Sequence, residues 1–220
     1  MTRTFLLLLA LSFGVVAQSP RPPYTVIVFG DSITEGGALP KDQRDRVWVK
    51  QVEAQSNGTL ILLNEGKGGR PTDSMKDFEA MLQRRPKADA LVIALGMNDS
   101  RDITTHCVPK AVANVRAMVA KARQAHGEKF PVLLVGPTNI NRAALGPTKS
   151  IGAQRETNLR ELGSAFAQLA IETHCEFTSL FGVVPEASLL KDGVHPDAEG
   201  NAAIAKAMGQ RLQGWLAGPR

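Results

Sequence analysis

From residue 24 onward, short apolar runs alternate with amphipathic stretches along the whole of this 220-residue chain. The runs occupy residues 25–29, 59–63, 90–95, 131–135 and, more weakly, 175–178. Runs of this length, rich in Val, Ile and Leu, are typical of buried strands. Continuous apolar strands separated by helices predict a parallel sheet covered on both faces. We therefore expect one three-layer α/β/α sandwich with a parallel sheet of about five strands.

Helical periodicity is clearest between residues 108 and 122, where apolar side chains recur every three or four positions. Similar stripes occupy residues 47–52, 75–82, 159–169 and 204–216. We interpret all of them as core-facing helix surfaces. The least regular internal segment is 141–152, which follows the fourth strand and is either a substrate-facing loop or a plain connector.

The N-terminal residues form a separate unit. Arg3 is the only charge before an apolar run from Phe5 to Val16, and small residues follow that run. This pattern predicts a signal peptide over residues 1–17 and a single domain over residues 18–220. A retained anchor is the weaker alternative, because the run is short for a membrane span and no charged stop-transfer flank follows. We expect a secreted or periplasmic protein without stable membrane insertion after signal removal.

Charge and motifs exclude several function classes. Removal of residues 1–17 would lower the formal net charge from +5 to +4, and the remaining basic residues are scattered. This argues against a nucleic-acid binder. The loop after the first strand has neither a Gly-x-Gly-x-x-Gly nor a Walker pattern, which argues against a nucleotide-binding site. Cys107 and Cys175 are expected at opposite sheet edges, so we expect two unpaired thiols.

The sequence Gly30-Asp31-Ser32-Ile33-Thr34 follows the first apolar run directly. Ser32 is therefore expected at the carboxyl edge of the sheet, where open α/β proteins bind ligands. A serine there suits a nucleophile, although Asp-Ser is also a common turn or N-cap pair.

A serine hydroxyl needs a base to accept its proton, and a carboxylate to orient that base. Of the four histidines, His195 fits this role best, because Asp192 precedes it by three residues in the loop before the last predicted helix. One ring nitrogen can then donate to Asp192 while the other faces Ser32. The alternative is that Asp192 is a turn residue and His195 an exposed residue at a helix start.

Two further strand ends carry groups able to stabilise a negative oxygen. Residues 64–70 form a glycine-rich stretch whose backbone N–H groups can point at an anion. After the third run, Asn98 can offer an uncharged amide donor. Ordinary turn chemistry would explain each of these separately, but four such features at one sheet edge are harder to attribute to turns.

These four segments, in this order, resemble the GDSL, or SGNH, hydrolase superfamily, and the residues 64–72 are similar to those of arylesterase and carbohydrate-esterase members. The resemblance implies a flavodoxin-like fold, with Ser32 as nucleophile, His195 as base and Asp192 as its orienting acid. It also implies an oxyanion hole made of the Ser32 N–H, the Gly69 N–H and the Asn98 side chain. Gly68 is an alternative to Gly69.

The resulting hypothesis is an exported serine esterase that removes short acyl groups, acetyl foremost, from an alcohol or a carbohydrate, without metal or cofactor. The second hypothesis is a lysophospholipase or thioesterase acting on longer acyl chains. The third is a non-catalytic module that binds carbohydrate or another envelope component. From their positions, Asp31, Arg70 and Asn139 are candidate substrate contacts. The sequence leaves the natural substrate and the oligomeric state open.

Overall fold

The computed structural model describes residues 23–217 and contains one five-stranded sheet. Its strands are β1 (Tyr24–Gly30), β2 (Leu60–Gly66), β3 (Ala90–Ala94), β4 (Val132–Gly136) and β5 (Glu176–Ser179). Every pairing is parallel, in the order β2-β1-β3-β4-β5. This is the flavodoxin-like strand order, so the expected fold class is confirmed.

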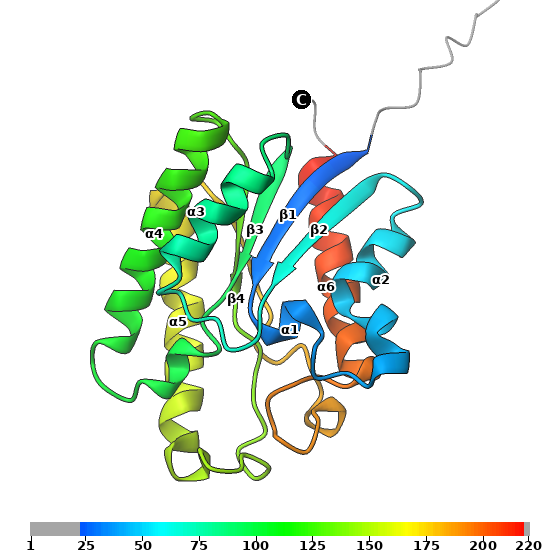
Figure 1. Cartoon of the computed structure of the whole chain (residues 1–220). Helices are drawn as coiled ribbons and strands as arrows, with labels where there is room; N and C mark the ends of the chain where they lie inside the picture. The colour runs from blue at the N-terminus through cyan, green and yellow to red at the C-terminus, as the bar shows by residue number, and fades with distance from the viewer. Residues whose placement is uncertain (1–22, 218–220) are drawn as a thin grey trace, which may run out of the picture.

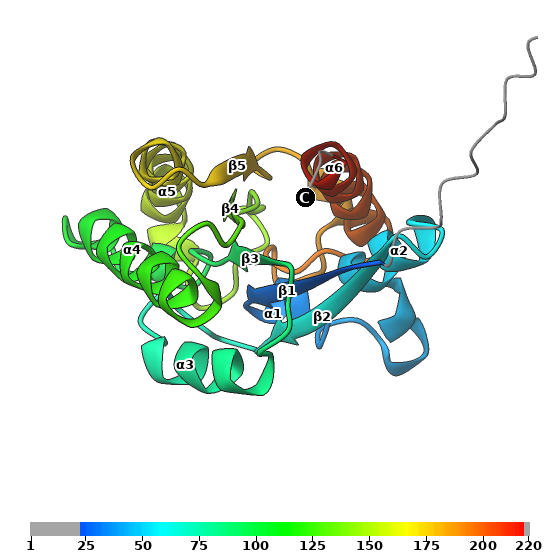
Figure 2. The same cartoon turned by 90° about the horizontal axis from the view of Figure 1, so that it is seen from above.

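Helices cover both faces of this sheet (Figures 1 and 2). One face carries α2 (Trp48–Gln55) and α6 (Ala198–Leu216), which pack against each other. The other carries α3 (Met75–Arg84), α4 (Cys107–His126) and α5 (Gly152–Glu172). The single-turn helix α1 (Ser32–Glu35) follows β1 directly, and short 3₁₀ segments occupy η1 (Lys41–Arg46), η2 (Asp99–Arg101), η3 (Lys149–Ile151) and η4 (Glu186–Ser188).

The central strand β1 shows why both faces need helices. Successive side chains of a strand point to opposite faces, and here the four from residue 26 to residue 29 are all apolar. Val26 and Val28 enter the core beneath α2 and α6, whereas Ile27 and Phe29 enter the core beneath α3, α4 and α5. All four side chains are fully buried, so β1 is held in the middle of the molecule and its carboxyl end is placed accurately.

One element boundary differs from the sequence-based expectation, and a second agrees with it. β2 continues through Asn64 and Glu65 to Gly66, which pairs with Gly30, so the glycine-rich loop begins only at Lys67. The polar side chain of Asn64 is accommodated because its amide donates to Thr34 O at 2.8 Å. The other boundary is the start of α5 at residue 152, which coincides with the expected end of the irregular segment 141–152.

The predicted signal peptide, residues 1–17, lies outside the described residues. Among residues 23–217, no helix has both the length and the apolar character needed to cross a membrane. Cys107, at the start of α4, and Cys175, just before β5, are both free thiols, as expected.

Candidate active site

Ser32 is the first residue of α1, immediately after the end of β1. Asp31 caps the helix, because its side chain accepts from the Ile33 N–H at 3.0 Å. The close approach of this turn to β1 requires glycine at position 30, since a Cβ there would lie 2.1 Å from the Thr34 hydroxyl oxygen. The local sequence thus forces a sharp turn that presents Ser32 at the sheet edge.

The Ser32 hydroxyl is connected to a histidine and a carboxylate by two hydrogen bonds. His195 Nε2 lies 2.8 Å from Ser32 Oγ, and His195 Nδ1 lies 2.6 Å from Asp192 Oδ2. Burial works against ionisation of Asp192, but hydrogen bonds from the backbone and ring of His195 and from the Val194 N–H lower its pKa. Asp192 is therefore a carboxylate near neutral pH, and it favours the tautomer in which Nδ1 donates and Nε2 accepts from Ser32.

The loop that carries Asp192 and His195 is held by backbone hydrogen bonds on both sides. Leu190 N–H donates to His195 O at 2.7 Å, and Gly193 N–H donates to Leu190 O at 2.8 Å. Gly193 O accepts from Asn141 N–H at 2.8 Å, which ties the loop to the segment after β4. Asp197 caps α6 by accepting from the Gly200 N–H. The spacing of three between acid and histidine is thus part of a compact, hydrogen-bonded turn.

Four groups at the carboxyl edge of the sheet have the character of oxyanion donors. Within the described part of the chain, the backbone N–H groups of Ser32, Gly68 and Gly69 meet no acceptor. Gly69 has φ +71, a conformation that favours glycine. The Asn98 amide donates to Arg70 O at 3.1 Å, which leaves its second N–H free.

The two loops that carry these donors are joined by a buried carboxylate contact. Thr72 donates to the Asp99 carboxylate through its backbone N–H, at 3.0 and 3.1 Å, and through its hydroxyl. The Asn114 amide from α4 donates to that hydroxyl at 3.1 Å. Burial raises the pKa of Asp99, while the Thr72 hydrogen bonds oppose this effect. Asn98, next to Asp99, is thereby held beside the loop that follows β2.

From the opposite side, α5 holds the segment 97–102. The Asn158 amide donates to Ser100 O at 3.1 Å and to Asp102 O at 2.8 Å. Arg155 donates through Nε to the Ser100 hydroxyl at 3.3 Å and through Nη1 to the Thr148 hydroxyl at 3.0 Å. Both residues are buried: Arg155 is 1% exposed and Asn158 is 2% exposed.

Sequence reasoning missed Arg155 and Asn158 because they lie just before the apolar stripe 159–169, in a stretch without a recognised motif. The position of Arg155 in the sequence could have indicated its role. Arg155 lies four residues before Leu159, in line with the apolar stripe, and a charged residue in such a position must find buried partners.

The three predicted substrate contacts have their side chains engaged inside the protein. Asp31 is 3% exposed, and burial raises its pKa to about 6. The Asn139 amide donates to Val184 O at 2.8 Å, and its oxygen accepts from the Gly182 N–H at 3.0 Å. Arg70 is 8% exposed and points across β2 towards β1. All three side chains are thus held by partners within the protein, and their contact with a substrate stays a prediction.

A cavity of about 280 Å³ lies next to Asn98. Polar groups from three segments line it: the loop after β2, the loop after β3 and the start of α4. The lining residues are Pro71, Asp73, Asn98, Asp99, Asp102, Cys107 and Lys110. Burial raises the pKa of the Cys107 thiol to about 11, so this thiol stays protonated at neutral pH and is a poor nucleophile.

Known proteins of similar structure share this architecture. A carbohydrate acetylesterase family member from Sinorhizobium meliloti aligns with a TM-score of 0.73 at 21% identity, over 88% of this chain and 99% of its own. The aryl esterase of M. smegmatis aligns with a TM-score of 0.66 at 20% identity, over 88% and 100%. The lipase/acylhydrolase from Enterococcus faecalis aligns with a TM-score of 0.69 at 20% identity, over 90% and 98%.

Sequence comparison supplies two further findings. The uncharacterized lipoprotein YqeF of Bacillus subtilis (strain 168) is 34% identical over 107 residues, which are 46% of this chain and 42% of that relative. The chain thus matches less than half the length of YqeF. The model of the GDSL-like lipase/acylhydrolase family matches residues 28–203, a span that includes the ends of β1, β2 and β3 and the Asp192–His195 loop. The chain belongs to the GDSL-like lipase/acylhydrolase family.

Proposed function

We propose that this protein is an exported serine esterase that removes short acyl groups, acetyl foremost, from alcohols or carbohydrates. Membership of an acylhydrolase family supports a carboxylic ester hydrolase. The observation that carries the proposal is the hydrogen-bonded chain from Ser32 Oγ through His195 to Asp192, with distances of 2.8 and 2.6 Å. This is the geometry of an activated nucleophile with an oriented base.

In the acylation step, Ser32 Oγ attacks the ester carbonyl carbon while His195 Nε2 takes the hydroxyl proton. The tetrahedral intermediate collapses, the bond to the alcohol oxygen breaks, and the imidazolium returns the proton to the leaving alcohol. A water then attacks the acyl-enzyme with His195 as base, which releases the carboxylic acid and restores Ser32. Asp192, as a carboxylate, stabilises the imidazolium during both steps.

The negative oxygen of each intermediate would be held by the N–H groups of Ser32 and Gly69 and by the Asn98 amide. Donors already fixed in place stabilise developing charge without reorganisation. The unpaired N–H groups at residues 32 and 69 and the held side chain of Asn98 support this role. The Gly68 N–H remains the alternative to that of Gly69.

A polar alcohol is supported as the leaving group by the cavity beside Asn98. Asp73, Asp102 and Lys110 at its wall can hydrogen-bond to hydroxyl groups. One structural neighbour is a carbohydrate acetylesterase family member, which favours the same class of substrate.

Export of the protein is supported by the sequence of residues 1–17. The relative YqeF is a lipoprotein, and a relative of that kind favours a location outside the cytoplasm. A free mature protein is our proposal for this chain, since no cysteine follows its apolar run up to residue 106.

The test is the initial rate on p-nitrophenyl acetate, butyrate, octanoate and palmitate, with Ser32→Ala as the matched variant. We expect fast acetyl turnover, a steep fall beyond butyrate, and loss of several orders of magnitude in the variant. An unchanged rate for Ser32→Ala would rule out the proposed nucleophile. If no ester gave a Ser32-dependent rate, a carbohydrate-binding module would become the hypothesis to test.

A lysophospholipase or thioesterase is the second candidate, and one observation favours it. Ile103, on the loop after Asn98, is 51% exposed and could contact a longer acyl chain. Under this alternative the rate series would peak at octanoate or beyond, and Ile103→Ser would lower kcat/KM for the long esters alone.

A further inference from the structure

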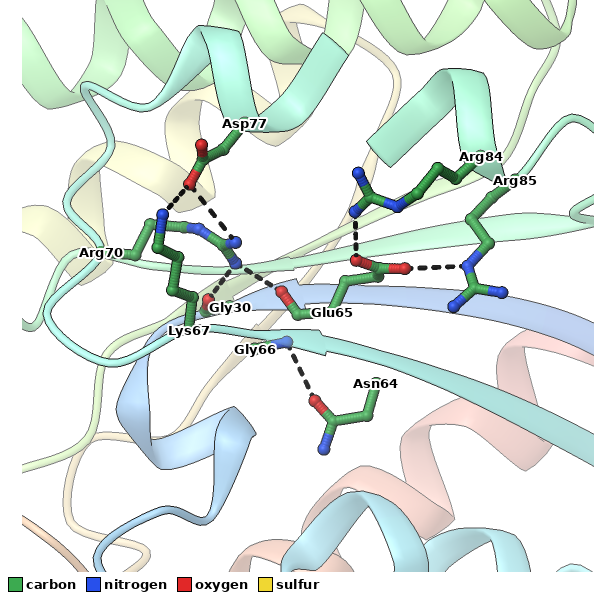
Figure 3. A network of polar contacts seen from close by, with 9 residues as sticks. All are labelled: Gly30, Asn64, Glu65, Gly66, Lys67, Arg70, Asp77, Arg84 and Arg85. Atoms are coloured by element: carbon green, nitrogen blue, oxygen red, sulfur yellow. Dashed lines mark hydrogen bonds and ion pairs between the residues drawn. The ribbon is translucent and has the colours of Figure 1, made fainter. Parts of the chain in front are cut away.

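Arg70 occupies an unusual position in the turn after β2. Its guanidinium carbon lies 4.0 Å from the centroid of the Phe29 ring, and only 7% of its side chain is exposed. Stacking on a buried ring restricts the guanidinium to one plane. Figure 3 shows this side chain running from the turn towards the ends of β1 and β2.

The guanidinium joins those two strand ends. Arg70 Nη1 donates to Gly30 O at 2.6 Å and also to Glu65 O. Gly30 O accepts in addition from the Lys67 N–H at 3.2 Å. Because Gly30 is two residues before Ser32, these bonds determine where the chain leaves β1 and enters the nucleophile turn.

The backbone of Arg70 makes the other two connections. Its N–H donates to Lys67 O at 3.3 Å, which closes the turn that contains Gly69. Its carbonyl accepts from Asn98 Nδ2 at 3.1 Å. One residue therefore contacts Asn98, lies next to Gly69 and holds the strand end that leads to Ser32.

The charge of Arg70 is balanced by a carboxylate from α3. Burial lowers the pKa of Arg70, and the nearby carboxylates, Asp77 foremost, oppose this effect. Asp77 Oδ2 lies 3.7 Å from Arg70 Nη2 and 2.7 Å from Lys67 Nζ. The Glu65 carboxylate is directed instead at Arg84 and Arg85 (Figure 3).

We propose that Arg70 is the positioning residue of the oxyanion hole, and that Asp77 holds its guanidinium in place. In this role, Arg70 fixes the separation between the N–H groups of Ser32 and Gly69 and the Asn98 amide without touching the substrate. The inference rests on the proposed esterase function. A displacement of about 1 Å among such groups is enough to cost on the order of a hundredfold in rate.

The experiment compares Arg70→Met, Arg70→Lys and Asp77→Asn with Arg84→Met as the control. Arg84 belongs to the same network, but its side chain is 56% exposed and it contacts the Glu65 carboxylate rather than Gly30. For each full-length protein, kcat and KM on p-nitrophenyl acetate and the inhibition constant of phenylboronic acid are measured. The boronate forms a tetrahedral anionic adduct with a nucleophilic serine, so it reports on the oxyanion hole independently of turnover.

We expect Arg70→Met to lower kcat roughly 10- to 100-fold at nearly constant KM, with a parallel rise in the boronate inhibition constant. Arg70→Lys should recover part of both, because lysine keeps the charge but lacks the planar fork. Asp77→Asn should show a smaller loss of the same kind, about three- to tenfold, and Arg84→Met should stay within twofold of wild type.

Two outcomes would overturn the inference. A folded Arg70→Met protein with kcat within twofold of wild type would do so, and so would a rise in KM at constant kcat, which is the signature of a substrate contact. If Arg70→Met failed to fold, Asp77→Asn would decide in the same way. A wild-type rate independent of Ser32 would instead refute the esterase function itself.

Discussion

Thr72 donates both its backbone N–H and its hydroxyl to the carboxylate of Asp99, which lies 27 residues further along the chain. Thr72 is 1% exposed. This contact joins the loop after β2 to the loop after β3, the two loops that supply Gly69 and Asn98. We therefore treat it as part of the framework of the proposed oxyanion hole.

Replacement of Thr72 by valine removes the hydroxyl donor at nearly constant shape. We expect the free energy of unfolding to fall by about 1–3 kcal/mol, because the Asp99 carboxylate and the Asn114 amide both lose a partner, and kcat to fall about tenfold. Thr72→Ser, which keeps the hydroxyl, should restore most of both. Urea unfolding and p-nitrophenyl acetate kinetics measure these effects. Equal kcat for Thr72→Val and wild type would show that the contact with Asp99 does not support the oxyanion hole.

The Asn98 side chain is the one proposed oxyanion donor that mutation can remove directly. We expect Asn98→Ala to lower kcat roughly 100- to 1,000-fold with little change in KM, which is the usual effect of deleting such a donor. The bond to Arg70 O is lost as well, so thermal unfolding should be recorded in parallel. A fall in kcat of less than threefold in a folded protein would remove Asn98 from the oxyanion hole.

Asp31 makes folding stability depend on pH. Burial raises its pKa from 3.8 to about 6 in the folded state, so folding favours the protonated carboxyl. Ionisation of Asp31 therefore lowers the free energy of unfolding. This destabilisation is absent below about pH 4, grows between pH 4 and 6, and stays at about 3 kcal/mol above pH 6. Asp31→Asn stays neutral and can keep the cap to the Ile33 N–H. It should therefore be the more stable protein above pH 6, by about that amount.

Urea unfolding of wild type and Asp31→Asn between pH 4 and pH 8 tests this dependence. The difference in unfolding free energy should close as the pH falls towards 4. A difference that does not vary with pH would show that burial of Asp31 does not shift its ionisation.

Asn158 holds two backbone carbonyls of the segment that follows Asn98. Asn158→Ala should cost about 2–4 kcal/mol of unfolding free energy, because two carbonyl oxygens lose their donor in a buried place. Asn158→Asp should cost more, since it directs a carboxylate oxygen at those carbonyls. Gln154→Ala serves as the control, because Gln154 is exposed and donates to the Asn158 oxygen, not to the two carbonyls. Equal stability of the alanine and aspartate variants would argue against this arrangement.

Local pattern was sufficient for the fold class and for the positions of Ser32, Asp192 and His195. Strand and helix periodicity is set by short-range geometry, and an Asp three residues before a His forms its contact within one turn. The end of β2 was predicted less accurately, because its pairing with β1 continues through polar residues. Asn64 and Glu65 belong to β2 because the pairing with β1 continues to Gly66.

The polar side chains with long-range partners could not be assigned in this way. Asp31, Arg70 and Asn139 read as site residues in the sequence, yet their side chains are directed into the protein. Arg155 and Asn158 read as ordinary helix residues, yet they hold the segment around Asn98. Their partners lie up to 58 residues away in the chain.

The sequence by itself therefore determined the alternation of elements, the parallel sheet and the residues brought to its carboxyl edge. The tertiary structure alone decided which buried polar groups support that edge. The physical reason is that a buried donor must find an acceptor wherever the packed neighbours provide one. Those neighbours depend on strand order and helix packing, which no local pattern encodes.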